Sequence, residues 1–119
     1  MLNFKDLAVW QRSHKMTLEI YKATRHFPKE EIFGLTSQIR RAVSSIPTNI
    51  AEGCGRRTNA ELANFLNIAS GSASEVEYEI LLSKEIGYIT LEQCNTWTRE
   101  ICEIRSMLAA YIKKLKTEH

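Results

Sequence analysis

The segment from Ser37 to Gly53 constrains the fold most, because it combines helical spacing of apolar residues with a proline and a glycine stop. Its apolar residues recur at steps of three and four, as on one buried helical face: Ile39, Ala42, Val43, Ile46 and Ile50. Pro47 lacks a backbone N–H and crowds the carbonyl four residues earlier, at Val43. We therefore expect a buried helix that bends or restarts at Pro47 and keeps a polar face for contacts.

Three further segments show helical periodicity, so the sequence predicts an all-α fold, an antiparallel up-down-up-down four-helix bundle. The expected boundaries are a first helix capped by Asp6 and ending near Arg25, a second from Leu35 to Gly53, a third after the capping box 58–61, and a fourth after Gly87 and the capping box 90–93. With 119 residues, of which 44% are hydrophobic, the chain is most simply one domain, residues 1–119.

The first and last expected helices carry more apolar surface than one small bundle needs. In the first helix, one apolar stripe contains Leu7, Trp10, His14, Thr17, Leu18 and Tyr21, and another side carries Val9, Met16 and Ile20. In the last, a seam of Leu91, Cys94, Thr98, Ile101, Arg105, Leu108, Ile112 and Leu115 is flanked by Trp97, Ile104 and Tyr111. The extra faces predict contacts with neighbouring chains.

Gly71 lies in the middle of the third expected helix, where glycine costs about 1 kcal/mol relative to alanine. A close approach of another helix, opposite Pro47, is the expected compensation.

Charge is distributed unevenly along the chain. Residues 1–60 carry ten Lys/Arg and five Asp/Glu, whereas residues 61–119 carry six and nine, so the halves differ in sign although the whole chain is +2. This asymmetry suits nucleic-acid binding through the first half, or association of subunits through oppositely charged faces, or simply solvated helix faces.

No motif indicates catalysis. His14 falls on an apolar stripe, which favours a structural histidine, and Glu75, Glu77, Glu79 and Glu85 lack the Glu-x-x-His spacing of bundle metal sites and are expected to be solvated. Cys54, Cys94 and Cys102 form neither a disulfide framework nor a zinc motif. We expect a non-enzymatic cytoplasmic protein without metal, cofactor, small-molecule substrate or membrane span.

The candidate binding residues are arginines near the second helix and the turn after it. Arg40 and Arg41 lie on the helix, and Arg56 and Arg57 follow Gly53 on a glycine-bounded turn, where guanidinium groups suit phosphate. Because adjacent helical residues diverge by about 100°, only one of Arg40 and Arg41 is expected to face a given ligand.

Several blocks of the sequence resemble the four-helix-bundle family of 23S rRNA intervening-sequence proteins. The resemblance rests on residues 4–11, 27–28, 34–42 and 45–53, and continues through Phe65, Leu66, Ala69, Gly71, Ser72, Glu75 and 87–89. It implies a small bacterial bundle that assembles as a homopentamer. A similar pentameric bundle is the accessory protein of diversity-generating retroelements, which engages nucleic acid and a reverse transcriptase.

Two functions follow as expectations. The first is a homopentamer that binds structured RNA such as 23S rRNA through Arg40, Arg41, Arg56 and Arg57. The second is a protein-interaction or scaffold module, for example an accessory subunit of a nucleic-acid-processing complex. In either case we expect structural or interface roles for Pro47, Asn49, Glu52, Gly53 and Gly71, with Asn49 satisfying backbone groups freed by Pro47.

Overall fold

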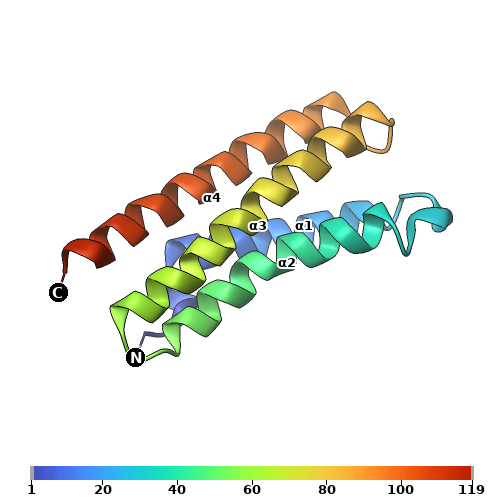
Figure 1. The fold of residues 1–119 in the computed structure, drawn as a ribbon. Coiled ribbons are helices and arrows are strands. Elements are labelled where there is room, and N and C mark those ends of the chain that lie inside the picture. The colour runs from blue at the N-terminus through green and yellow to red at the C-terminus, as the bar shows by residue number, and fades with distance from the viewer. Residues whose placement is uncertain (1, 119) are drawn as a thin grey trace.

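A computed structural model describes residues 2–118, which form four long antiparallel helices (Figure 1). They are α1 (Ala8–Thr24), α2 (Leu35–Cys54), α3 (Asn59–Glu85) and α4 (Leu91–Thr117). Two 3-10 turns, η1 (Phe4–Asp6) and η2 (Lys29–Glu31), precede α1 and α2. Contacts join α1 to α2, α2 to α3, α3 to α4 and α4 to α1, which confirms the predicted up-down-up-down bundle.

The helix ends follow the expected capping residues closely, with two exceptions. The capping box at 58–61 is incomplete, because the Thr58 hydroxyl accepts from the Glu61 amide but the Glu61 carboxylate accepts from the Thr58 hydroxyl and not from the Thr58 amide. The Thr90 hydroxyl accepts from the Gln93 backbone amide, and the Gln93 side-chain oxygen accepts from the Thr90 backbone amide, so this capping box is complete. Gly87 adopts a φ of 88° after α3, a left-handed conformation that suits glycine. Asp6, however, does not cap α1; it closes η1, and α1 begins after Leu7 without a side-chain cap.

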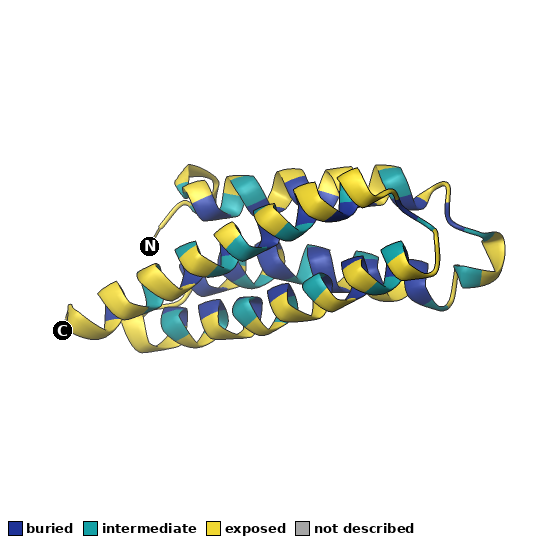
Figure 2. Ribbon diagram, turned by 90° about the horizontal axis from the view of Figure 1, so that it is seen from above, coloured by how far each residue is buried: buried dark blue, intermediate teal, exposed yellow. Residues whose placement is uncertain are grey.

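The core lies on one side of α1, and the structure decides which of the two apolar sides faces it. Val9, Met16 and Ile20 are buried against the bundle, whereas Leu18 and Tyr21 are exposed. Figure 2 shows the resulting two-sided character, with dark buried segments facing inward and yellow ones outward. The surplus apolar face of α1 is therefore the Leu18 face.

The expectation of a surplus apolar face on α4 is wrong for two of its three residues, Trp97 and Ile104, while Tyr111 is partly buried. Trp97 and Ile104 are buried in the same core as Ile101 and Leu108. Leu91, which was expected to begin the seam, is exposed at the first turn. The buried positions cover a broader arc than a coiled-coil seam, because α4 packs on α3 along its length and also on α1.

The second helix continues through Pro47 without a break, so a restart at the proline is wrong, and a bend there stays a prediction. The Val43 carbonyl, which lacks its helical donor, lies 3.2 Å from the Thr17 hydroxyl of α1. The same hydroxyl lies 2.8 Å from the Ser13 carbonyl. The single hydroxyl proton of Thr17 is therefore shared between the Ser13 carbonyl of its own helix and the Val43 carbonyl, which loses its helical donor to the proline.

Asn49 has a different role from the expected one. Its side-chain amide donates to the Ser45 carbonyl over 2.8 Å and to the Ser45 hydroxyl over 2.9 Å. The Ser45 hydroxyl in turn lies 2.9 Å from the Ser72 hydroxyl of α3. Asn49 thus supports a polar link between α2 and α3 instead of reaching Val43.

The close approach expected at Gly71 occurs at Gly53 instead. A Cβ atom on Gly53 would lie 2.9 Å from both Leu62 Cδ1 and Phe65 Cβ of α3, so glycine lets the two helices meet. Gly71 is exposed, and a Cβ atom there would meet nothing within 4 Å. The packing of this chain gives no reason for a glycine at position 71.

Candidate nucleic-acid interface

Arg40 serves the packing of α1 on α2. Its Nε donates to the Thr24 hydroxyl over 2.8 Å, its Nη2 donates to the Tyr21 carbonyl over 3.2 Å, and its guanidinium lies 4.9 Å from the centre of the Tyr21 ring. A cation at the C-terminal turn of a helix is also favoured by the helix dipole. Arg40 therefore holds the end of α1, and part of its donor capacity is already used.

Arg41 points away from that contact and is the more accessible of the two, with 70% of its side chain exposed. Its Nη2 lies 3.9 Å from Glu75 Oε2 of α3, a long and solvated ion pair. Such pairs contribute little to stability. Arg41 can exchange this partner for a phosphate at low cost.

The two arginines of the α2–α3 turn also differ. Arg56 lies over the Phe65 ring, 4.8 Å from its centre, and its Nη2 is 3.6 Å from Glu52 Oε2. Glu52 therefore pairs with Arg56 of the same chain, at the C-terminal end of α2. Arg57 is exposed on the same turn and forms no ion pair with any residue from 2 to 118. Arg57 and Arg41 are thus the candidate residues best placed to meet an external anion.

Glu79 is a functional candidate that the sequence analysis missed, because it was expected to be solvated. It is only 4% exposed, and within the described chain its Oε1 has no hydrogen-bond partner. Burial raises the pKa of Glu79 to about 7, the adjacent Glu75 carboxylate adds to the rise, and Arg41 opposes it. Glu79 lies two helical turns after Ser72, which contacts Ser45 of α2. The helical spacing therefore indicates that Glu79 lies on the same side of α3, facing α2.

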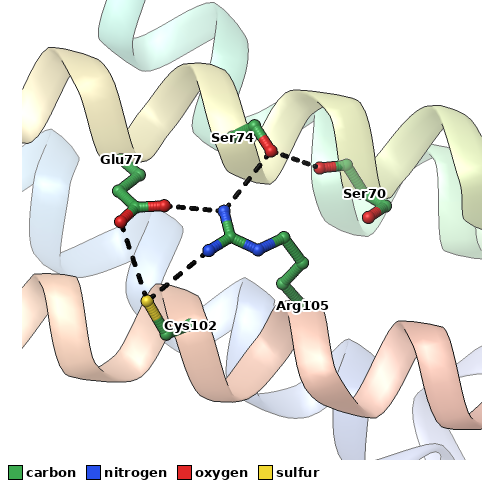
Figure 3. Close-up of polar contacts among 5 residues, drawn as sticks. All are labelled: Ser70, Ser74, Glu77, Cys102 and Arg105. Carbon is green, nitrogen blue, oxygen red and sulfur yellow. Dashed lines mark hydrogen bonds and ion pairs between the residues drawn. The ribbon is translucent and has the colours of Figure 1, made fainter.

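A second polar group links α3 to α4 through Arg105, the residue that interrupts the apolar seam (Figure 3). Arg105 Nη1 donates to Glu77 Oε1 over 2.7 Å and to the Ser74 hydroxyl over 3.3 Å. Its Nη2 lies 3.6 Å from Cys102 Sγ. The Glu77 hydrogen bond raises the pKa of Arg105. Glu77 is therefore a half-buried ion-pair partner that links α3 to α4, and not the fully solvated carboxylate that was expected.

A groove between α1 and α4 carries charges of both signs. Its lining includes Lys15 and Arg99 beside Glu19 and Glu103, over a floor that includes Trp97. At one side Arg12 donates to both carboxylate oxygens of Glu100, over 3.0 and 2.6 Å. The mixed lining does not suit a polyanion.

None of the helices in residues 2–118 is long and apolar enough to cross a bilayer.

Comparison with known proteins shows which family this chain belongs to. The family model for 23S rRNA-intervening sequence proteins matches residues 5–110. The chain belongs to the 23S rRNA-intervening sequence protein family. This confirms the resemblance seen in the sequence, and the match spans all four helices of the bundle except the last turns of α4.

A solved member of a related family shares the bundle. It is a protein of unknown function from the S23 ribosomal protein family of Bacteroides thetaiotaomicron, with 32% sequence identity and a TM-score of 0.80. The alignment covers 89% of this chain and 99% of the Bacteroides protein. No curated protein matches the chain. Membership in the 23S rRNA-intervening sequence protein family therefore establishes the fold, while the described relative carries no assigned activity.

Proposed function

We propose that this member of the 23S rRNA-intervening sequence protein family is a non-enzymatic cytoplasmic homo-oligomer, a pentamer by family resemblance, that binds structured RNA such as 23S rRNA. The observation that carries the proposal is the exposure of Arg41 and Arg57 with weak or no ion pairing in the chain. Exposed guanidinium groups suit phosphates, because they present several donors and keep their charge.

The other two candidate arginines have a supporting part in this proposal. Arg40 and Arg56 already use hydrogen bonds or ring contacts within the chain. Both keep their charge and add positive potential to the chain, which attracts RNA over several ångströms. Most of the phosphate contact energy is assigned to Arg41 and Arg57.

An electrophoretic shift titration with a fragment of 23S rRNA at several salt concentrations tests the proposal. We expect saturable binding at low salt that weakens as salt rises, because phosphate contacts release counterions. The variant Arg41→Ala/Arg57→Ala is expected to bind more weakly and to lower the magnitude of the salt slope by about two, about one for each arginine that is removed.

The matched control is Lys29→Ala/Arg99→Ala, which removes the same charge from other elements of the chain. It is expected to bind nearly as well as the wild type. Absence of saturable binding at low salt would contradict the RNA proposal. Equal losses in both double variants would contradict the assignment to Arg41 and Arg57.

A protein-interaction module is the second candidate function, and one observation favours it. Phe33 is 95% exposed on the turn before α2, and Ile32, Ile86 and Leu91 are also exposed at this end of the bundle. The turn before α2 and the turn between α3 and α4 lie at the same end of the bundle (Figure 1). The Tyr88 hydroxyl donates to Glu31 Oε2 over 2.7 Å and links these two turns. Loss of a specific protein partner in Phe33→Asp, with RNA binding unchanged, would support this function.

A further inference from the structure

We propose that the outward face of α1 in one copy of this chain docks on the outward face of α3 in a second copy. This inference rests on the proposed homo-oligomer and adds the surfaces that form it. It is based on the spacing, exposure and charge of two exposed helical stripes, one on α1 and one on α3.

The α1 stripe is basic with an apolar centre. Lys15, Leu18, Lys22 and Arg25 follow one another at steps of three and four residues, which places them on one line along the helix. All are exposed, and Leu18 is 58% exposed. None of the three cations forms an ion pair with a residue in the described part of the chain. The stripe itself contains no acidic residue, and the exposed Glu19 lies beside it, between Lys15 and Lys22.

The α3 stripe has a similar spacing and the opposite charge. It contains Ile68, Gly71, Glu75 and Tyr78 at steps of three and four, and Glu85 seven residues further along the same line, beyond the half-buried Leu82. All five are exposed, and Tyr78 is 60% exposed. Glu75 also lies 3.9 Å from Arg41, and the stripe itself contains no basic residue. The two lines are therefore complementary in charge, and both carry large apolar side chains.

The two helices cannot satisfy one another within one molecule, because α1 and α3 share no contact in the bundle. A second copy brings the stripes together. Such a contact is heterologous, since it joins different surfaces of the two copies, and it leaves one stripe of each kind free for the next copy. Repetition then builds a ring or another extended assembly from one kind of interface.

Gly71 supplies an independent reason for a partner on α3. A helix-interior glycine is unfavourable, and nothing in this chain lies within 4 Å of the position that its Cβ atom would occupy. A helix of another chain that crosses α3 at Gly71 can approach its backbone closely. Leu18, at the centre of the α1 stripe, is a side chain of suitable size for that contact.

The test uses charge reversal in the full chain, followed by light scattering at low salt and micromolar concentration. The α1 variant is Lys15→Glu/Lys22→Glu, and the α3 variant is Glu75→Lys/Glu85→Lys. We expect each variant alone to lose the assembly, because every contact then joins like charges. A chain that carries all four substitutions is expected to assemble again, since every contact in a ring of any size then joins a reversed α1 stripe to a reversed α3 stripe.

Two controls keep the result interpretable. Lys113→Glu/Lys114→Glu makes the same charge change on α4 and is expected to leave the assembly mass unchanged. Circular dichroism establishes that each variant is folded. If the α3 variant does not fold, Gly71→Leu replaces it, because the single chain has open space there; it is expected to be folded and to lose the assembly.

The outcomes separate this inference from the proposed function. An assembly that persists in the α1, α3 and Gly71→Leu variants would overturn the docking inference and leave the oligomer intact. A wild-type monomer would overturn both. Loss of RNA binding in the α1 variant with unchanged mass would assign the α1 stripe to RNA, which also overturns the docking inference.

Discussion

The Thr17 hydroxyl of α1 lies 3.2 Å from the Val43 carbonyl of α2, the acceptor that Pro47 leaves without its helical donor. This contact makes a buried proline tolerable, because an unpaired buried carbonyl is costly. It also fixes the height of α1 against α2. The most recognisable segment of the family thus has a packing reason that involves a residue thirty positions upstream of the proline.

Thr17→Val is expected to destabilise the protein by about 1–3 kcal/mol, because it leaves the Val43 carbonyl unpaired in the core. Thr17→Ser keeps the hydroxyl and is the control. In a Pro47→Ala background, where the backbone N–H returns, Thr17→Val is expected to cost much less. Urea unfolding at a fixed protein concentration measures the stability of the wild type, of the three single variants and of the double variant. Equal costs in both backgrounds would show that Thr17 does not serve the proline.

Glu79 predicts a pH dependence of stability. Its pKa is raised to about 7 by burial and by Glu75, so the folded state keeps a proton that the unfolded chain loses above about pH 4.5. Stability is therefore expected to fall as the pH rises from about 4.5 to 7, by roughly 1–3 kcal/mol, and then to level off. Glu79→Gln is expected to remove this fall.

The matched control for Glu79→Gln is Glu92→Gln, which changes an exposed carboxylate of α4. Thermal unfolding across that pH range measures both variants. A wild-type fall that survives in Glu79→Gln would assign the pH dependence to another group.

Gly53→Ala is expected to destabilise the α2–α3 contact by about 1–3 kcal/mol, because its Cβ atom would lie 2.9 Å from Leu62 and Phe65. Gly55→Ala, two residues later, is the control. A Cβ atom there would lie 3.5 Å from the Glu52 carbonyl oxygen, an ordinary contact, so little change is expected. Thermal unfolding compares the two, and equal melting temperatures would contradict the close approach at Gly53.

Substitutions of Arg40 and Arg41 are expected to have different effects, one mainly on stability and the other mainly on RNA binding. Arg40→Ala removes two hydrogen bonds and a ring contact and is expected to cost about 1–3 kcal/mol of stability. Arg41→Ala is expected to change stability by less than about 0.5 kcal/mol, because its ion pair is exposed. RNA affinity is expected to fall more in Arg41→Ala. The reverse order in both measurements would contradict the assignment.

The sequence was sufficient for the helices because their ends are encoded locally. Thr58, Thr90 and Gly87 marked helix boundaries through capping chemistry that acts over a few residues. The prediction that Asp6 caps the first helix was wrong, because a 3-10 turn competes with the α-helix for the same residues. Asn3, not Asp6, makes the side-chain cap at that turn.

The contacts between helices were harder to predict, since periodicity gives a face but not its partner. Trp97 and Ile104 were assigned to a spare flank, although a helix packed on two neighbours buries a broader arc. Glu79 was missed because charge suggested solvent, whereas its position beside the buried stripe decided its environment. The roles of Thr17, Arg40 and Gly53 depend on which helices meet, and no local pattern carries that information.

Native mass spectrometry of the purified chain with a 23S rRNA fragment at low salt tests the proposed RNA-binding assembly most directly. The account predicts a species with five copies of the 13.7 kDa chain, and the same species with RNA bound. It also predicts loss of the RNA-bound species in Arg41→Ala/Arg57→Ala, with the protein assembly intact. A single 13.7 kDa chain without an RNA-bound form would contradict it.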